Sequence, residues 1–157
     1  MIFMNKATFA AGCFWGVQAA FDQLDGVEKT TVGYTGGNTK NPTYKEVCTD
    51  KTGHAEAIVI QFDPVKISYE KLLDTFWFIH DPTQINRQGP DIGTQYRTAI
   101  FFHDEIQKEI AIRSKNEKEK LLNMKIQTEI TKATQFYPAE DYHQYYLKKQ
   151  GGSSCII

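Results

Sequence analysis

The sequence predicts an α+β fold, a two-layer sandwich with a ferredoxin-like βαββαβ core plus an additional strand and helices. The first observation behind this prediction is the order of the elements, because the first four strands and two helices run β-α-β-β-α-β. The second is the long irregular segment between the second and third strands, which contains no helical crossover. A doubly wound parallel sheet, the competing fold, needs such crossovers between its strands.

The first strand, helix and second strand follow from residues 6–34. Residues 6–11 read as a short strand that breaks at Gly12 into a helical pattern. The apolar residues of that helix recur at roughly helical spacing, at Phe14, Val17, Phe21 and Leu24. Gly26 is a plausible helix end, and residues 27–34 form the second strand.

The third strand and second helix show two different periods. Four residues of one parity share a strand face: Glu56, Ile58, Ile60 and Phe62. Ser68 is a credible N-cap for the helix that follows, which should stop before Pro82. Its stripe consists of Tyr69, Leu72, Leu73, Phe76 and His80.

The C-terminal third supplies the fourth strand and the additional elements. Alternation at Tyr96, Thr98, Ile100 and Phe102 predicts the fourth strand. The charge-rich residues 104–122 suit an exposed helix, and Ile126, Thr128 and Ile130 mark a fifth strand. We expect residues 1–157 to form a single catalytic domain that ends in a flexible tail at about residues 150–157, where two glycines and two serines occur.

Composition narrows the class of protein. The chain has 157 residues, of which 41% are hydrophobic, enough for one sizeable core. Its 18 basic and 19 acidic residues leave a formal charge of −1, without the long basic run that nucleic-acid binding requires. No apolar run approaches the ~20 residues that span a bilayer, and residues 1–6 are too short for a signal peptide. We therefore expect a soluble, cytoplasmic monomer that binds neither nucleic acid nor membrane.

Cofactor motifs are missing from the sequence. The three cysteines, Cys13, Cys48 and Cys155, are too few and too far apart for a disulfide scaffold or a zinc site. The four histidines are scattered without metal-binding spacing, and no glycine-rich nucleotide motif opens a helix after a strand. We expect no metal, flavin or nicotinamide, so that any electrons come from another thiol protein.

Cys13 is the candidate nucleophile because it follows Gly12 at the predicted turn from strand to helix. Unpaired backbone N–H groups and the helix dipole favour a thiolate there, although a buried, inert cysteine is the alternative. The adjacent Phe14 and Trp15 could form an apolar cradle for a methyl or thioether group. Phe14 also belongs to the apolar stripe of the helix and could simply fill the core.

These residues, Gly12-Cys13-Phe14-Trp15, resemble the active-site signature of the A-type peptide methionine sulfoxide reductases. The resemblance covers most of the chain, in blocks that follow in the family's order. The further blocks are residues 33–37 (GYTGG), 41–48 (NPTYKEVC), 53–56 (GHAE), 80–83 (HDPT), 91–97 (DIGTQYR) and 136–144 (FYPAEDYHQ). One short match can arise by chance, but so many blocks in one order very rarely do.

The resemblance implies a role for each matching residue. Cys13 would attack the sulfoxide sulfur, Phe14 and Trp15 would hold the substrate methyl group, and Glu56 would be the acid. The hydroxyls of Tyr44 and Tyr96 would bind the sulfoxide oxygen, and Asp91 would organise substrate or ordered water. Packing alone is the alternative for both tyrosines. Site residues implied in this way are Cys13, Phe14, Trp15, Tyr44, Glu56, Asp91 and Tyr96.

The chemistry supports an acid at Glu56. A sulfoxide oxygen leaves poorly unless it receives a proton while the thiolate bonds to sulfur. Glu56 starts an otherwise apolar strand face, where loss of hydration raises the pKa of a carboxyl group. The alternative is a solvent-exposed carboxylate at a strand end, or one that is paired with a lysine.

The products would be methionine and a sulfenic acid on Cys13, which a second thiol can convert to a disulfide. Cys155 is the candidate because its Gly-Gly-Ser-Ser tether could carry it to the site, although it could also be a terminal thiol without a role. We interpret Cys48 as a buried bystander. The implied partners are thioredoxin or a similar thiol reductant, and oxidised proteins, peptides or free methionine sulfoxide.

Two other classes of protein remain open. In a cysteine hydrolase, His54 or His143 would activate Cys13 toward an acyl-enzyme, and the redox state of the cysteines would not change. In a non-catalytic peptide-binding module, the aromatic and glycine-rich loop would hold the peptide and no oxidised substrate would turn over.

Overall fold

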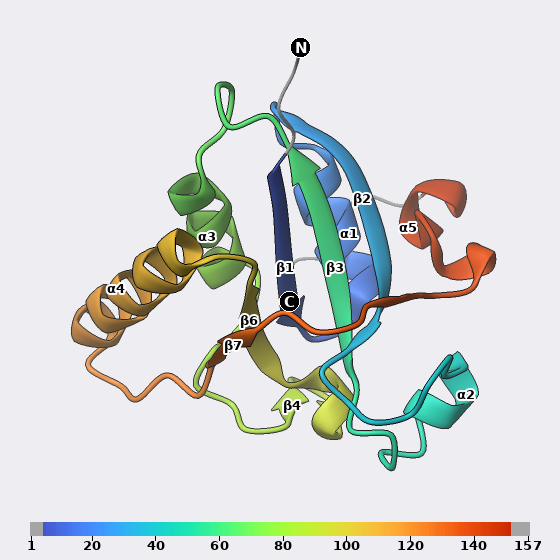
Figure 1. The fold of residues 1–157 in the computed structure, drawn as a ribbon. Coiled ribbons are helices and arrows are strands. Elements are labelled where there is room, and N and C mark those ends of the chain that lie inside the picture. Colours follow the sequence, from blue (N-terminus) through green and yellow to red (C-terminus); the bar gives the residue numbers. More distant parts are fainter. Residues whose placement is uncertain (1–4, 152–157) are drawn as a thin grey trace.

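The structure, a computed structural model, describes residues 5–151 as a central sheet with helices packed on one face (Figure 1). Its six strands lie in the order β7-β6-β1-β3-β2-β8. The strands are β1 (Asn5–Ala11), β2 (Val27–Thr35), β3 (Ala55–Phe62), β6 (Thr98–Phe102), β7 (Glu129–Lys132) and β8 (Tyr137–Pro138). The longer helices are α1 (Phe14–Asp22), α3 (Tyr69–Phe78) and α4 (Glu105–Leu122).

The α+β class predicted from the sequence is confirmed. β1 pairs antiparallel with both β3 and β6, and β3 pairs antiparallel with β2. Each strand-helix-strand unit therefore has an antiparallel strand between its two parallel strands, β3 in the first unit and β1 in the second. The additional strand β7 extends the sheet by pairing parallel with β6.

The core lies between the sheet and the helices. Phe9 of β1 is fully buried, and its ring centroid lies 5.7 Å from that of Phe21 in α1 and 5.0 Å from that of Phe76 in α3. Ile58 and Ile60 of β3 face the same layer, as the strand parity predicts. Loss of a buried phenylalanine costs about 3–5 kcal/mol, so this cluster fixes both helices against the sheet.

Side chains define the ends of the second predicted helix. Ser68 accepts a hydrogen bond from the Lys71 N–H at 3.1 Å and caps the start of α3. The helix ends at Phe78, so His80 lies beyond it rather than on its stripe. Its ring instead bonds the Phe76 carbonyl oxygen at 2.6 Å and the Thr98 hydroxyl at 2.7 Å. Burial lowers the pKa of His80 to about 4, so this joint is neutral at pH 7.

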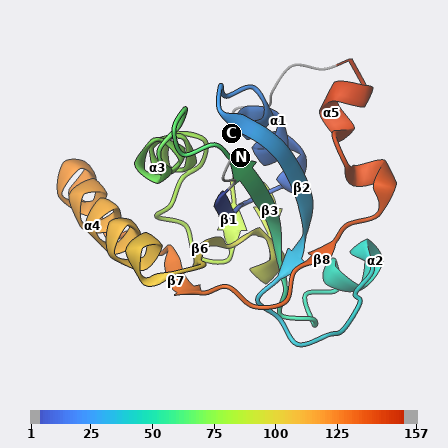
Figure 2. The same cartoon turned by 45° about the horizontal axis from the view of Figure 1, so that its top comes forward.

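The chain after β7 crosses the other face of the sheet on its way to β8 (Figure 2). Here Phe136 packs against a small cluster of Ala10, Ala57, Ala99 and Phe101. Gly33 permits this crossing, since a Cβ atom there would lie 2.3 Å from the Tyr137 carbonyl oxygen.

Two strand predictions need correction. Tyr96 does not belong to the fourth strand but ends a 3₁₀ turn, Thr94–Tyr96, before β6. The fifth strand begins at Glu129, because the preceding backbone is bonded elsewhere: the Ile126 N–H donates to Glu119 and the Gln127 N–H to the Pro82 carbonyl.

Several short elements were not predicted, and most of the predicted tail is not described. The short elements are α2 (Tyr44–Val47), β4 (Arg87–Gln88), β5 (Asp91–Ile92), a 3₁₀ turn (Asp141–His143) and α5 (Tyr146–Lys149). None is long enough to show a clear sequence period. Residues 152–157 of the predicted tail, including Cys155, lie outside the described residues. Within the described part of the chain, no helix is both long and apolar enough to cross a membrane.

Candidate active site

The candidate residues converge at one edge of the sheet. β1 and β2 end at this edge, whereas β3 and β6 begin there (Figure 1). Gly12, with φ of +94°, turns the chain from β1 toward α1 and leaves Cys13 as the N-cap residue of the helix. A glycine adopts this backbone conformation readily, whereas a side chain would be strained. The strand-to-helix turn predicted at Cys13 is confirmed.

The half-buried Cys13 thiol is neutral in this structure. Its pKa is raised to about 12, chiefly by burial and then by the carboxylates of Glu56 and Asp91. The N–H groups of Trp15 and Gly16 act in the opposite direction, as the helix start predicts, but do not overcome burial. The lowering expected from the helix start is therefore present, but the net shift of the Cys13 pKa is upward.

Glu56 has the environment of a buried acid. Its side chain is 1% exposed, and burial raises its pKa to about 8. Oε1 accepts the Phe14 N–H at 3.2 Å, while Oε2 finds no hydrogen-bond partner among the described residues. The carboxyl group is thus mainly protonated at pH 7, and it has an oxygen free to present that proton. The rise in pKa expected from the apolar strand face is the direction that the structure supports.

Tyr44 and Tyr96 lie within electrostatic range of Glu56. Burial raises the pKa of both phenols, and the Glu56 carboxylate contributes to both shifts. Asp91 of β5 also contributes to the shift of Tyr96. Both phenols stay neutral near pH 7 and can donate hydrogen bonds, as a site for a sulfoxide oxygen requires.

A polar tether joins the two loops that carry these tyrosines. The backbone N–H of Thr94 donates to Asp50 Oδ1 at 2.9 Å, and its hydroxyl donates to the same oxygen. Asp50 follows α2, which begins at Tyr44, and Thr94 opens the turn that ends at Tyr96. The sequence does not reveal this contact between Asp50 and Thr94, because the two residues lie 44 positions apart.

Trp15 is fixed by residues from the C-terminal segment. Its indole N–H donates to His143 Nδ1 at 3.0 Å, and its ring stacks on Tyr146 with centroids 3.9 Å apart. The buried His143 ring also lies 5.3 Å from the ring of Phe14 and 4.4 Å from that of Tyr44. The sequence analysis assigned His143 no role in a reductase, although it belongs to the last family-like block.

Phe14 fills the core, which was the alternative considered for it, and its part in a methyl cradle stays a prediction. The side chain is 1% exposed and belongs to the core, with its ring 5.7 Å from that of Tyr34. Its backbone N–H simultaneously holds Glu56, so the residue connects the start of α1 to the acid.

Glu140 fastens the C-terminal segment beside these aromatic residues. It accepts the Tyr34 hydroxyl at 2.9 Å and the Tyr44 N–H at 3.0 Å. Burial raises the pKa of Glu140, but these hydrogen bonds outweigh it and the net shift is downward. Glu140 is thus a charged anchor, unlike Glu56.

The positions of Cys48, His54 and His143 bear on two interpretations, the buried Cys48 and the cysteine hydrolase. Cys48 is exposed at the C-terminal end of α2, so its description as buried was wrong. In the described residues neither histidine of the hydrolase hypothesis hydrogen-bonds Cys13: His54 bonds Gly37 and Thr39, and His143 bonds Trp15. The described residues also contain no group of three or more side chains that could hold a metal ion.

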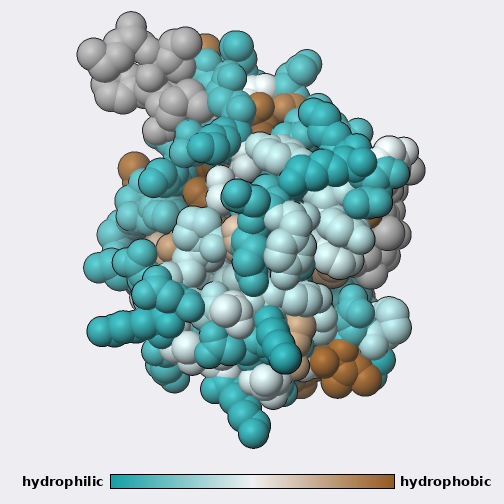
Figure 3. Space-filling model, turned by 90° about the vertical axis from the view of Figure 1, so that its right-hand side faces the viewer, coloured by the Kyte–Doolittle hydropathy of each residue, from teal (hydrophilic) through white to brown (hydrophobic). Residues whose placement is uncertain are grey.

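Figure 3 shows the side of the molecule that carries α2 and α5. Residues of intermediate hydropathy gather in its middle, strongly hydrophilic residues surround them, and hydrophobic residues form only small separate patches. This face therefore offers no broad apolar surface.

Comparisons with known proteins identify enzymes that are similar in sequence to this chain. The family model described as peptide methionine sulfoxide reductase matches residues 5–157. A relative from Methanosarcina acetivorans, named peptide methionine sulfoxide reductase MsrA, is 57% identical over 156 residues, which cover 98% of this chain and 83% of the relative. The protein of the same name from Pasteurella multocida is 57% identical over 154 residues, covering 98% and 88% of the two chains.

Solved structures agree with the sequence comparisons. Mxr1 from Saccharomyces cerevisiae in its reduced form has a TM-score of 0.91 at 36% identity, covering 98% of this chain and 89% of Mxr1. Methionine sulfoxide reductase A of Corynebacterium diphtheriae has a TM-score of 0.86 at 36% identity, covering 97% and 77%. Mxr1 in complex with Trx2 matches with a TM-score of 0.66 at 26% identity, covering 91% and 84%.

Proposed function

Since the chain belongs to the peptide methionine sulfoxide reductase family, we propose a role in its reaction for each residue at the edge of the sheet. The protein is a thiol-dependent enzyme that reduces methionine sulfoxide to methionine. Residues 1–157 act as a single catalytic domain, and the substrates are oxidised proteins, peptides or free methionine sulfoxide.

Substrate binding divides the sulfoxide between apolar and polar partners. Trp15, with Phe14 behind it, contacts the methyl group, and the Tyr44 and Tyr96 hydroxyls donate to the sulfoxide oxygen. Asp91 organises the substrate or an ordered water beside them. Because the methyl group and the oxygen each meet a fixed partner, the site accepts one epimer at sulfur, and the resemblance to the family implies that this is the S epimer.

Glu56 supplies the proton that the reaction needs. The Cys13 sulfur attacks the substrate sulfur while the proton of Glu56 moves to the sulfoxide oxygen, and the proton released from the Cys13 thiol restores the Glu56 carboxyl group. The oxygen then passes to Cys13, so that the thiol and the sulfoxide become a sulfenic acid and methionine. The observation that carries this assignment is the buried Glu56 carboxyl group, whose pKa is raised to about 8 and whose Oε2 has no hydrogen-bond partner among residues 5–151.

A second thiol and a reductant complete the cycle. Cys155, which lies outside the described residues, attacks the Cys13 sulfenic acid, releasing water and forming a Cys13–Cys155 disulfide. This bond requires the two Cα atoms to approach to about 4.4–6.8 Å. Yeast Mxr1 has been solved in complex with Trx2. We propose that a thioredoxin-like dithiol likewise reduces the disulfide in this chain, and that the enzyme works in the cytoplasm, where thiols are kept reduced.

The experiment offers the S and R epimers of a methionine sulfoxide peptide separately, with dithiothreitol as reductant, and measures the methionine formed. We expect turnover of the S epimer alone, and none after Cys13→Ser, because a serine hydroxyl lacks the nucleophilicity of a thiolate. Comparable turnover of the R epimer would contradict the proposed stereochemistry. Residual turnover in Cys13→Ser above a few per cent would remove Cys13 from its role.

A further inference from the structure

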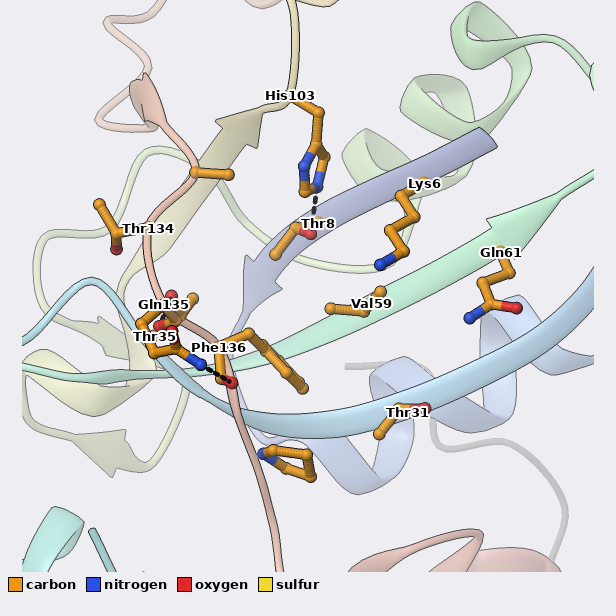
Figure 4. Close-up of a pocket in the computed structure, with 12 residues that line it drawn as sticks. Lys6, Thr8, Thr31, Thr35, Val59, Gln61, His103, Thr134, Gln135 and Phe136 are labelled. Atoms are coloured by element: carbon orange, nitrogen blue, oxygen red, sulfur yellow. Dashed lines mark hydrogen bonds between the residues drawn. The ribbon is translucent and has the colours of Figure 1, made fainter. Parts of the chain in front are cut away.

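A second concave site lies on the face of the sheet opposite α1 and α3, at the other end of β1 from Cys13 (Figure 4). It is a groove of about 510 Å³, bounded by strands β1, β2 and β3 and by the crossing segment before β8. Its lining includes Lys6, Thr8, Thr31, Gln61, His103 and Phe136. None of these residues takes part in the reaction proposed above.

A row of basic and amide side chains crosses one end of this groove, with Lys6 and Gln61 in its lining and Lys29 just beyond it. Lys6 lies opposite Gln61 in the pairing of β1 with β3, and Gln61 lies opposite Lys29 in the pairing of β3 with β2. Cross-strand partners share a face, so the two lysines flank the amide. Figure 4 shows the Lys6 amino group extending over the sheet, with the His103 ring to one side above Thr8.

No carboxylate from the described residues lines the groove to balance this charge. The nearby Asp104 caps α4 by accepting the Gln107 N–H at 2.8 Å. Burial lowers the pKa of His103, and the positive charge of Lys6 lowers it further, although Asp104 opposes the shift. The Thr8 and Thr31 hydroxyls, one row deeper, add hydrogen-bond donors.

The other part of the groove is apolar. Phe136 lies across Gly33, where a Cβ atom would be 2.6 Å from its ring. Val59 projects from β3 between Thr8 and Thr31, its partners on the two neighbouring strands. A flat ring could therefore pack against Phe136 and Val59 while a negative group attached to it reaches the basic row.

We propose that this groove binds a small aromatic phosphate ester, with the phosphate against Lys6 and Gln61 and the ring against Val59 and Phe136. A phosphate oxygen accepts hydrogen bonds, and its negative charge is opposite to the positive charge of Lys6. The site is independent of the chemistry proposed at Cys13, so either assignment can fail without the other.

The test is a titration of the full-length protein with phenyl phosphate, followed through the NMR signals of the His103 ring in phosphate-free buffer. We expect a saturable shift, and binding of inorganic phosphate about fivefold weaker because it has no ring. Lys6→Gln should weaken phenyl phosphate about fivefold, the factor for the ~1 kcal/mol of one ion contact in water. The matched control is Lys118→Gln on α4, which should bind like the unaltered protein.

Circular dichroism and methionine sulfoxide turnover check that Lys6→Gln is folded and active. A shift that does not saturate would overturn the proposal, as would an equal loss of binding in Lys6→Gln and Lys118→Gln. Equal affinity for phenyl phosphate and inorganic phosphate would overturn the aromatic part of the assignment.

Discussion

Two buried titratable groups, Glu56 on β3 and His80 between α3 and β6, are both neutral at pH 7 for the same reason. Burial raises the pKa of Glu56 to about 8 and lowers that of His80 to about 4. Their hydrogen bonds differ. Both ring nitrogens of His80 have partners, whereas one oxygen of Glu56 has none among the described residues. The satisfied group joins structural elements, and the unsatisfied group is available for chemistry.

Replacing the unsatisfied group should have the largest effect. We expect Glu56→Gln to slow the reduction step by roughly 10²–10⁴-fold, because the amide cannot give up a proton. The rate in the unaltered enzyme should also fall above about pH 8, as Glu56 loses its proton, and this decline should vanish in the variant. Single-turnover methionine formation against pH measures both. An unchanged rate would mean that water or the tyrosines supply the proton.

The same substitution should affect stability in a definite direction. The folded pKa of Glu56, about 8, lies above its ordinary value of 4.5, so the unfolded chain loses this proton first. Stability from the protonated form is therefore complete below pH 4.5 and lost as pH rises through about 8. Urea unfolding should show Glu56→Gln gaining stability relative to the unaltered protein at alkaline pH.

His80 should show the opposite pH dependence. The unfolded imidazole takes up a proton below about pH 6.5, whereas the folded one does so only near pH 4. Stability is therefore complete above pH 6.5 and falls as the pH drops toward 4, by about 3 kcal/mol. We expect His80→Gln to lower stability at pH 7.5 and to remove much of this acid-side decline. Equal declines in both proteins, measured by urea unfolding, would contradict it.

Turnover at the edge of the sheet should also depend on Cys155, a thiol that lies outside the described residues. In Cys155→Ser, the first methionine should still form, but thioredoxin-supported turnover should fall by about tenfold or more. Mass spectrometry after one turnover of the unaltered enzyme should find a single Cys13–Cys155 disulfide. Cys48→Ser is the matched control, with turnover unchanged. Full thioredoxin-supported turnover in Cys155→Ser, or a Cys13–Cys48 bond, would exclude this relay.

The smallest expected effect on activity comes from a comparison of the two tryptophans, Trp15 and Trp77. Trp15 donates its indole N–H to His143 at the site, and Trp77 donates to Ser114 between α3 and α4. Trp15→Ala should lower kcat/KM about tenfold, or ~1.4 kcal/mol, through lost contact with the substrate methyl group. Trp77→Phe should leave kcat/KM unchanged. Unaltered kcat/KM in Trp15→Ala would contradict its assignment to the methyl pocket.

The sequence by itself determined the local structure of this protein. Helical spacing placed α1 and α3, the Ser68 cap fixed the start of α3, and strand parity put Glu56 on the apolar face. These features depend on neighbours within a few residues along the chain, which a sequence displays directly. The resemblance to the family likewise identified Cys13 as the candidate nucleophile from the sequence alone.

The tertiary structure alone decided the properties that depend on distant residues. It moved Tyr96 from the strand into a turn tied to Asp50, and it exposed Cys48. It also reversed the expected shift of Cys13, because the sum of burial and surrounding carboxylates exceeds the effect of a helix start. Solvent exclusion and electrostatic interaction arise from atoms that are close in space, and a sequence pattern contains no measure of that distance.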